Sequence, residues 1–101
     1  MTGCVHQGDI LRIEKIKLPV LVVSKDFFNS AGEIIGCPVY ETGEESALHI
    51  LLESTEATHI VHCEKLALFD LKVRRYSKAG SIGMKDIMNI TDAVQGIFDY
   101  V

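Results

Sequence analysis

Residues 20–23 form a short run of β-branched and aliphatic side chains, V-L-V-V, with Pro19 before it and polar residues at 24–26. A short apolar run bounded by a proline and polar residues is typical of a strand buried on both faces rather than of a helix. Proline is tolerated as the first residue of a strand, because no interior ladder hydrogen bond is lost there. We therefore expect a central strand at residues 20–23, with the other elements arranged around it.

The composition favours a single domain, residues 1–101, with a hydrophobic core of its own, since 48% of the 101 residues are apolar. No window approaches the roughly 20 apolar residues of a membrane span. The N-terminal sequence lacks the basic start and apolar centre of a signal peptide. The three cysteines, Cys4, Cys37 and Cys63, are an odd number without a close pair, which argues against a disulfide framework. We expect a soluble cytoplasmic protein.

Charge is distributed unevenly along the chain. Residues 33–64 carry seven acidic side chains and no lysine or arginine, whereas residues 65–85 carry six basic side chains and one acidic one. The net charge of −4 argues against nucleic-acid binding through bulk charge. A local basic segment can still contact phosphates.

Several further short strands are expected. The stretch 10–16 does not alternate strictly, which indicates a bulge. Residues 33–40 read as a strand that Gly36 and Pro38 interrupt, which indicates a bulge or a sheet edge. Further strands are expected at 49–52, 59–64, 66–71 and 81–82, with turns at 29–32 and 76–80.

The clearest helix covers residues 84–100. Apolar side chains recur there at spacings of three and four, at Ile87, Ile90, Val94 and Ile97. Several short strands followed by one terminal helix predict a mainly β fold, a compact barrel or sheet closed by the helix.

Five features in order resemble one family. They are Q-G-D-I at 7–10, P-V-L-V-V-S at 19–24 followed by Asn29, V-H-C-E-K at 61–65, F-D-L-K-V-R at 69–74, and the terminal helix. In this order they resemble the MazF/PemK family of toxin endoribonucleases over nearly the whole chain. The resemblance implies an SH3-like barrel with a C-terminal helix, a homodimer, an antitoxin as protein partner, and cleavage of single-stranded mRNA without a metal or other cofactor.

The chain departs from the family pattern at several positions. The family has a longer loop that ends in a catalytic arginine before the proline, whereas here Leu18 precedes Pro19 and Lys17 is the nearest base. Tyr40 stands where the family has a threonine or serine, with Thr42 two residues later. Lys65 replaces the usual glutamine. We therefore take Lys17 and Thr42 as catalytic candidates beside the pair described next.

RNA can be cleaved by its own 2′-hydroxyl, given a base, an acid and a cation for the phosphorane charge. His62 and Glu64 lie two residues apart on one expected strand and would project side by side. The resemblance assigns catalytic roles to both positions, so we expect Glu64 as base and His62 as acid, or the reverse. The alternative is that both side chains lie on the solvent-exposed face of an ordinary strand and have no catalytic role.

The RNA-binding candidates are Tyr40 for base stacking and Lys65, Lys72, Arg74 and Arg75 for phosphates. Lys17 or Arg74 would steady the reacting phosphate. The basic run 72–75, with Tyr76 beside it, reads equally well as a solvated hairpin tip.

A zinc site built from His59, His62, Cys63 and Cys37 is not expected. Adjacent residues of a strand point to opposite faces, so one strand cannot present both His62 and Cys63. Cys37 and Cys63 are expected to fill core space.

Two other functions remain open at this point. A barrel of the same fold that has lost cleavage would bind a protein or RNA. A toxin of the CcdB type would block a protein target such as gyrase through the C-terminal helix.

Overall fold

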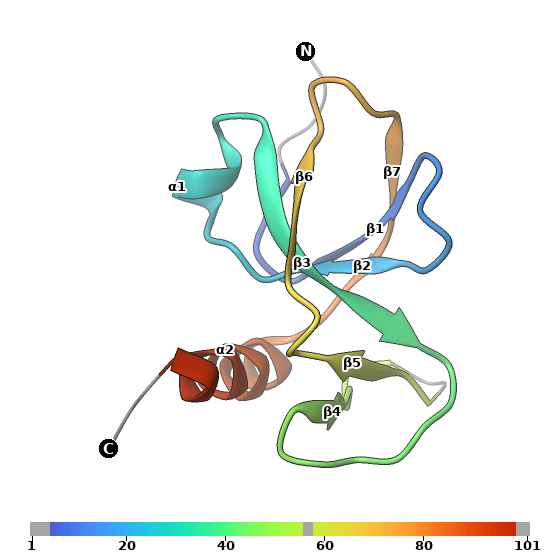
Figure 1. Cartoon of the computed structure of the whole chain (residues 1–101), viewed down its shortest axis with the longest axis vertical. Coiled ribbons are helices and arrows are strands. Elements are labelled where there is room, and N and C mark those ends of the chain that lie inside the picture. The colour runs from blue at the N-terminus through green and yellow to red at the C-terminus, as the bar shows by residue number, and fades with distance from the viewer. Residues whose placement is uncertain (1–4, 56–57, 99–101) are drawn as a thin grey trace.

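The computed structural model describes residues 5–55 and 58–98. These residues form seven strands and two helices: β1 (Asp9–Ile13), β2 (Val20–Val22), α1 (Asp26–Asn29), β3 (Glu33–Tyr40), β4 (His49–Leu51), β5 (Ile60–His62), β6 (Ala67–Asp70), β7 (Tyr76–Ser81) and α2 (Met84–Phe98). The strands pair antiparallel in the order β4-β5-β3-β2-β1-β7, with β6 added to β3. Figure 1 places α2, β4 and β5 at one end of the long axis and the β6–β7 connection at the other.

The predicted central strand is confirmed as β2, although it ends one residue earlier than expected. All three of its residues are buried, and it lies between β1 and β3. Leu21 pairs with Ile10 on one side and with Cys37 on the other. The apolar run is continuous because both faces of this strand meet core side chains.

β3 has the predicted bounds but is not an edge strand, so that alternative was wrong. Residues 33–36 pair with β6, whereas Val39 and Tyr40 pair with β5. Val39 donates its N–H to Pro19 on the β2 side, so the nitrogen of Pro38 faces the opposite side, between the two partners. The missing N–H of Pro38 therefore removes no ladder hydrogen bond.

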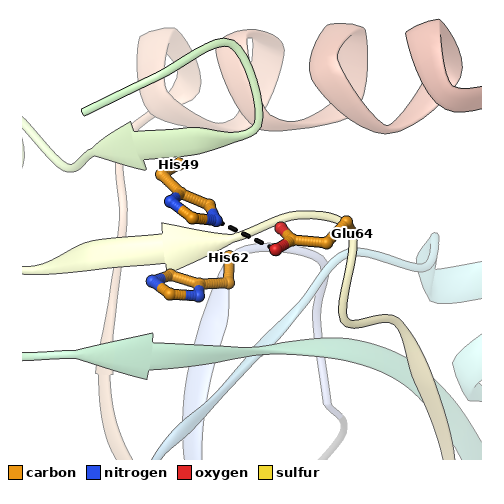
Figure 2. Close-up of side chains that lie close together, drawn as sticks. All are labelled: His49, His62 and Glu64. Atoms are coloured by element: carbon orange, nitrogen blue, oxygen red, sulfur yellow. Dashed lines mark hydrogen bonds and ion pairs between the residues drawn. The ribbon is translucent and has the colours of Figure 1, made fainter. Parts of the chain in front are cut away.

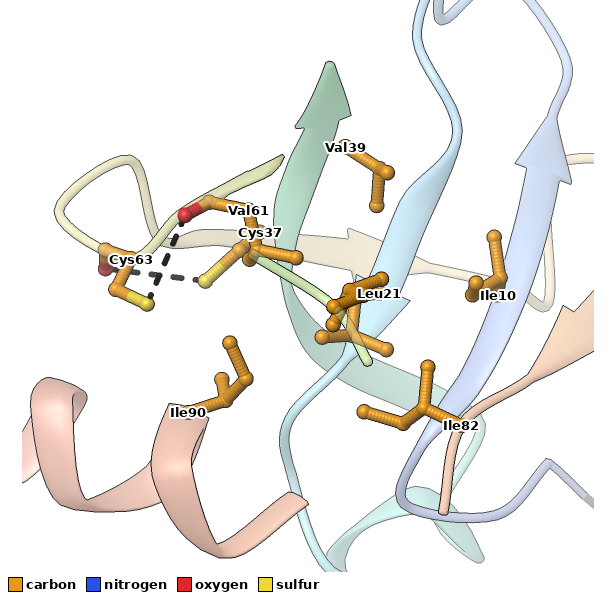
Figure 3. Close-up of a cluster of buried hydrophobic side chains, with 9 residues drawn as sticks. Ile10, Leu21, Cys37, Val39, Val61, Cys63, Ile82 and Ile90 are labelled. Carbon is orange, nitrogen blue, oxygen red and sulfur yellow. Dashed lines mark hydrogen bonds between the residues drawn. The ribbon is translucent and has the colours of Figure 1, made fainter. Parts of the chain in front are cut away.

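The main core lies between the sheet and α2 (Figure 3). Its buried members come from four strands, from α2 and from the segments beside them: Ile10, Leu21, Cys37, Val39, Leu52, Val61, Cys63, Ile82 and Ile90. Burial raises the pKa of the Cys37 thiol to about 12 and that of Cys63 to about 11. Their predicted role as core filling is confirmed.

The predicted helix is confirmed as α2 up to Phe98, and residues 99–100 lie outside the described part of the chain. Ile90 is buried, and Ile87 and Val94 pack against the same core, whereas Ile97 is 38% exposed. None of the helices in the described residues is long and apolar enough to cross a membrane.

The start of α2 is held by a buried carboxylate. Asp86 accepts hydrogen bonds from the Glu53 N–H at 3.0 Å, from the Ser54 N–H at 2.7 Å and from the Ser54 hydroxyl at 2.5 Å. Burial raises the pKa of this carboxyl, but the hydrogen bonds from Ser54 and Glu53 outweigh that effect and hold it below its usual value.

Several details differ from the sequence-based expectations. The strand expected at 59–64 is the shorter β5, so Glu64 lies in the turn after it and not on the same strand as His62. Residues 76–80 are not a turn but most of β7, which pairs with β1 through Ile13 and Tyr76. β1 stops at Ile13, because Lys15 adopts a left-handed turn conformation with φ of 67°. The short helix α1 was not expected. The predicted irregularity in the first strand is confirmed, as the β1–β7 register shifts between Ile10 and Leu11.

Candidate functional site

Three aromatic side chains stack at the end of the β3–β5–β4 part of the sheet. His49 of β4 and His62 of β5 are register partners, and their ring centroids lie 3.8 Å apart with an interplanar angle of 12°. Tyr40 of β3 stacks on His62 with centroids 3.9 Å apart. Because β5 lies between β4 and β3, the His62 ring is held between the other two.

Glu64 completes this cluster from the turn that follows β5. Its Oε2 lies 2.9 Å from His49 Nε2 (Figure 2). The hydrogen bond from His49 holds the pKa of Glu64 below its usual value, so the carboxyl is ionised at neutral pH. The side chains of His49 and Glu64 are 30% and 37% exposed, which leaves the pair open to a ligand from solvent.

Among the described residues, His62 stands out because one of its ring nitrogens is buried without a hydrogen bond. Its Nδ1 is buried and has no hydrogen-bond partner in the described residues. Burial lowers the pKa of His62, and the neighbouring His49 lowers it further, whereas Glu64 acts in the opposite direction. The ring is therefore neutral at pH 7, with a nitrogen able to accept a proton.

Lys65 joins the cluster through Tyr40. Its Nζ donates to the Tyr40 hydroxyl at 2.9 Å and lies 5.1 Å from the centre of the tyrosine ring. This hydrogen bond raises the pKa of Lys65, which keeps its charge at neutral pH. The structure thus brings together four of the residues singled out from the sequence, namely Tyr40, His62, Glu64 and Lys65.

The other candidates lie elsewhere. Lys72, Arg74 and Arg75 belong to the β6–β7 connection, at the opposite end of the molecule from β4 and β5 (Figure 1). Arg74 donates to the backbone oxygen of Glu14 at 3.1 Å. Lys72 lies 3.6 Å from an Asp70 carboxylate oxygen.

Lys17 and Thr42 are exposed residues of the β1–β2 and β3–β4 connections. Within the described residues, neither forms a hydrogen bond or ion pair with His62 or Glu64. The β1–β2 connection does approach the end of β3, since the Pro19 oxygen accepts the Val39 N–H at 2.9 Å.

His49 is the member of the cluster that sequence reasoning missed. It was placed at the start of an expected strand but given no role. Its signal lay in the register of the β4–β5 hairpin, which sets His49 opposite His62. A period-two pattern gives the face of each strand but not the pairing between strands.

The donor atoms of His49, His62 and Glu64 all lie within 4.8 Å of one another, and they form the one such three-donor group in the described residues. His59, one of the four residues considered for a zinc site from the sequence, is not part of this group. Its Nδ1 lies 3.2 Å from the Thr55 hydroxyl. Two imidazoles and an ionised carboxylate at an open surface can transfer protons, orient one another or bind a cation.

Comparisons with solved structures show the fold. A MazE–MazF complex from Deinococcus radiodurans matches with a TM-score of 0.83 at 15% identity, over 95% of this chain and 97% of that one. An endoribonuclease from a mycobacterial species matches with a TM-score of 0.80 at 14% identity, over 93% and 90% of the two chains. An endoribonuclease in complex with its cognate antitoxin, also mycobacterial, gives 0.80 at 14% identity, over 96% and 99%. The predicted mainly β, SH3-like barrel with a C-terminal helix is confirmed.

Sequence comparison gives the family. A search of curated proteins found no significant match. The family model described as PemK-like, MazF-like toxin of type II toxin–antitoxin system matches residues 9–98, which is most of the chain. The chain therefore belongs to the PemK/MazF family of toxins of type II toxin–antitoxin systems, whose members are endoribonucleases.

Proposed function

We propose that this toxin cleaves single-stranded RNA through the cluster formed by His49, His62 and Glu64. The observation that carries the proposal is the stack of His62 on His49, with Glu64 hydrogen-bonded to His49 at an exposed surface. Two proton-transfer groups side by side are what attack by the 2′-hydroxyl requires, and the nucleophile belongs to the RNA itself. The reaction therefore needs no metal.

The two imidazoles divide the proton transfers. His62, neutral at pH 7, accepts the proton of the 2′-hydroxyl as its oxygen attacks phosphorus. His49, when protonated, donates a proton to the 5′-oxygen as the P–O5′ bond breaks. The products are a 2′,3′-cyclic phosphate and a free 5′-hydroxyl, so atoms and charges balance.

Glu64 is assigned as the positioning residue of His49. An ionised carboxylate that accepts the Nε2 proton of an imidazole fixes the orientation of that ring. This assignment differs from the sequence-based expectation, in which Glu64 was itself the second proton-transfer group. The hydrogen bond between Glu64 and His49 supports the change.

Lys65 is the cation that we assign to the reacting phosphate, in preference to Lys17 or Arg74. It follows Glu64 directly and is held beside the cluster by Tyr40. A charged donor beside the phosphorus stabilises the charge that develops on the non-bridging oxygens. Lys72, Arg74 and Arg75 belong to the β6–β7 connection, which lies at the other end of the molecule from β4 and β5, and would contact RNA beyond the cleavage site (Figure 1).

We further propose a cognate antitoxin as protein partner, a homodimer as the working form and the cytoplasm as its location. A relative of the same fold occurs in complex with its cognate antitoxin. The outer face of α2 carries Met84, Met88 and Phe98, which are 69%, 57% and 71% exposed. Large apolar side chains grouped on a surface are typical of protein-binding sites.

The experiment that tests this function uses two single-stranded RNAs of the same sequence, one unmodified and one with 2′-O-methyl nucleotides. Each is incubated with the purified protein in EDTA, and the fragment ends are examined. We expect cleavage of the unmodified RNA only, with 2′,3′-cyclic phosphate ends. Cleavage of the methylated RNA, or 3′-hydroxyl ends, would contradict attack by the 2′-hydroxyl. Binding of RNA without cleavage would instead support the alternative of a cleavage-inactive barrel.

A further inference from the structure

We propose that His49, His62 and Glu64 also form a binding site for a divalent transition-metal ion of the zinc type, and that the bound ion stops RNA cleavage. The first part stands on the geometry of the cluster. The second part rests on the proposed function. The zinc ligands considered from the sequence alone did not include His49 or Glu64.

The donor set matches the chemistry of zinc. Zinc is bound in proteins by imidazole nitrogen, carboxylate oxygen and thiolate sulfur, and two histidines with one carboxylate is a common set with an open position for water. Magnesium and calcium prefer oxygen ligands alone, so the cluster discriminates against them. The site lies at the surface, since the His49 and Glu64 side chains are 30% and 37% exposed.

The spacing requires only side-chain movement. Donor atoms of the three residues lie within 4.8 Å of one another. A tetrahedral ion with bonds of about 2.0–2.1 Å places its ligand atoms about 3.4 Å apart. The cluster therefore closes by an ångström or so, which rotation about the Cα–Cβ and Cβ–Cγ bonds supplies while β4 and β5 keep their register.

One ring must leave the stack, because two parallel imidazoles cannot both direct their in-plane lone pairs at the same point. His62 is the ring that moves. Its rotation gives up the stacking on Tyr40 and His49. It breaks no hydrogen bond, because the His62 side chain forms none in the described residues and its buried Nδ1 has no partner. A buried polar atom without a partner is unfavourable, and coordination of the turned ring relieves this.

The ion replaces one existing interaction. It takes the place of the proton that His49 Nε2 and Glu64 Oε2 share, and that proton is released to solvent. Both imidazoles then use their lone pairs on the metal. An imidazole that holds a metal ion on one nitrogen carries a proton on the other and cannot take up a further proton. With the ion bound, His62 therefore cannot accept the proton of the 2′-hydroxyl, and His49 cannot reach the protonated form that donates to the 5′-oxygen.

Competing zinc ligands are few in the described residues. Cys37 and Cys63 are fully buried, and their thiols have a raised pKa, which disfavours the thiolate that binds metal. Cys4 lies outside the described residues, so the test is done on a Cys4→Ser background. His6 is bonded through its ring to Asp26 and is not part of a three-donor group.

The binding test measures affinity for Zn²⁺ by competition with a chromogenic chelator at constant pH. We expect one ion per chain in the Cys4→Ser protein. His49→Ala, His62→Ala and Glu64→Gln should each weaken binding by at least about tenfold. His59→Ala is the matched control, because this histidine lies on the same hairpin but outside the cluster, and it should leave the affinity unchanged.

Co²⁺ supplies a second readout that does not depend on variants. The bound ion should show visible d–d absorption without a thiolate charge-transfer band. Circular dichroism of each variant confirms that it is folded before its affinity is compared. Equal affinity in wild type and Glu64→Gln, a thiolate band, or no binding up to about 1 mM Zn²⁺ would each overturn the proposed site.

Measurements of RNA cleavage with and without Zn²⁺ distinguish the proposed metal site from the proposed ribonuclease function. Zn²⁺ at saturating concentration should stop RNA cleavage, EDTA should restore it, and Mg²⁺ should have no effect. Zinc binding by a protein that cleaves no RNA even in EDTA would uphold the metal site and reject the proposed function. Cleavage that continues unchanged with the site saturated would overturn the inhibitory role.

Discussion

His49 and His62 face each other across the β4–β5 pair as register partners, with ring centroids 3.8 Å apart. Their side chains occupy the same face of two neighbouring strands, although the residues are 13 positions apart in the sequence. His49, which had no role assigned from the sequence, is therefore paired with His62 in the structure.

Glu64→Gln should lower kcat for RNA cleavage by about tenfold and leave KM nearly unchanged, because the substitution weakens the orientation of His49 without removing a phosphate contact. Steady-state kinetics on a fluorogenic RNA measures both constants. Glu53→Gln is the control, since Glu53 pairs with Lys85 at another part of the surface. A rise in KM with an unchanged kcat would place Glu64 in RNA binding instead.

Tyr40 supports the cluster in two separable ways. Tyr40→Phe keeps the ring stacked on His62 but removes the hydroxyl that accepts the hydrogen bond from Lys65. Tyr40→Ala also removes the stack, and it should lower the free energy of unfolding by about 0.5–1.5 kcal/mol more than Tyr40→Phe does. Urea unfolding of the two variants measures this difference. Equal stabilities would show that the stack adds nothing to the fold.

Gly36 is expected to tolerate no side chain. A Cβ at this position would overlap Val20 Cγ1 and lie 2.9 Å from the backbone oxygen of Leu21, so β2 and β3 would have to separate. Gly36→Ala should therefore lower the free energy of unfolding by about 1–3 kcal/mol.

Gly96 in α2 gives the matched control, because a Cβ there meets no atom within 4 Å. Gly96→Ala should raise the free energy of unfolding by up to about 1 kcal/mol, since alanine favours the helix. Thermal and urea unfolding of both variants provide the measurement. A destabilised Gly96→Ala together with a neutral Gly36→Ala would contradict the packing described above.

Asp86 should make the stability depend on pH in the acid range. Because its pKa is lower in the folded protein than in the unfolded chain, its contribution is complete above the ordinary aspartate pKa of about 3.9 and is lost as the pH falls through the lowered value. Asp86→Asn should reduce stability by about 1–3 kcal/mol at pH 7, because the amide keeps one acceptor oxygen for the Glu53 N–H but places an NH2 donor where the other oxygen accepts from Ser54.

The measurement for Asp86 is the urea midpoint from pH 7 to pH 2. The curve of Asp86→Asn should be flatter between pH 4 and pH 2 than that of the wild type, whereas Asp92→Asn, on an exposed part of the same helix, should change neither the midpoint nor the slope. Parallel curves for wild type and Asp86→Asn would remove Asp86 as the source of the acid sensitivity.

The two strands in the middle of the sheet, β2 and β3, were the ones that the sequence predicted best. β2 is an unbroken apolar run, and β3 keeps the predicted bounds from Glu33 to Tyr40 because its ends meet turn residues. β7 was missed because most of its side chains are exposed and include Lys78 and Gly80, so it lacks an apolar run. Its strand conformation comes from pairing with β1, which is a long-range effect.

In the candidate site too, contacts within one segment could be predicted from the sequence, whereas contacts between strands could not. His62 and Glu64 could be paired because they lie two residues apart, although Glu64 falls in the turn after β5 and not within a strand as expected. His49 and Tyr40 could not be joined to them, because the contacts cross from β4 and β3 and depend on register. The Asp86–Ser54 contact joins residues 32 positions apart and left no local signal beyond the position of Asp86 in the first turn of the helix.

The most direct test of the account is single-turnover cleavage of one single-stranded RNA in EDTA by the wild type, His49→Ala, His62→Ala and the control His59→Ala. We predict that both cluster variants fold normally and cleave about 10²-fold or more slowly than the wild type, while His59→Ala cleaves at the wild-type rate. Wild-type rates in both His49→Ala and His62→Ala would contradict the assignment of RNA cleavage to this pair.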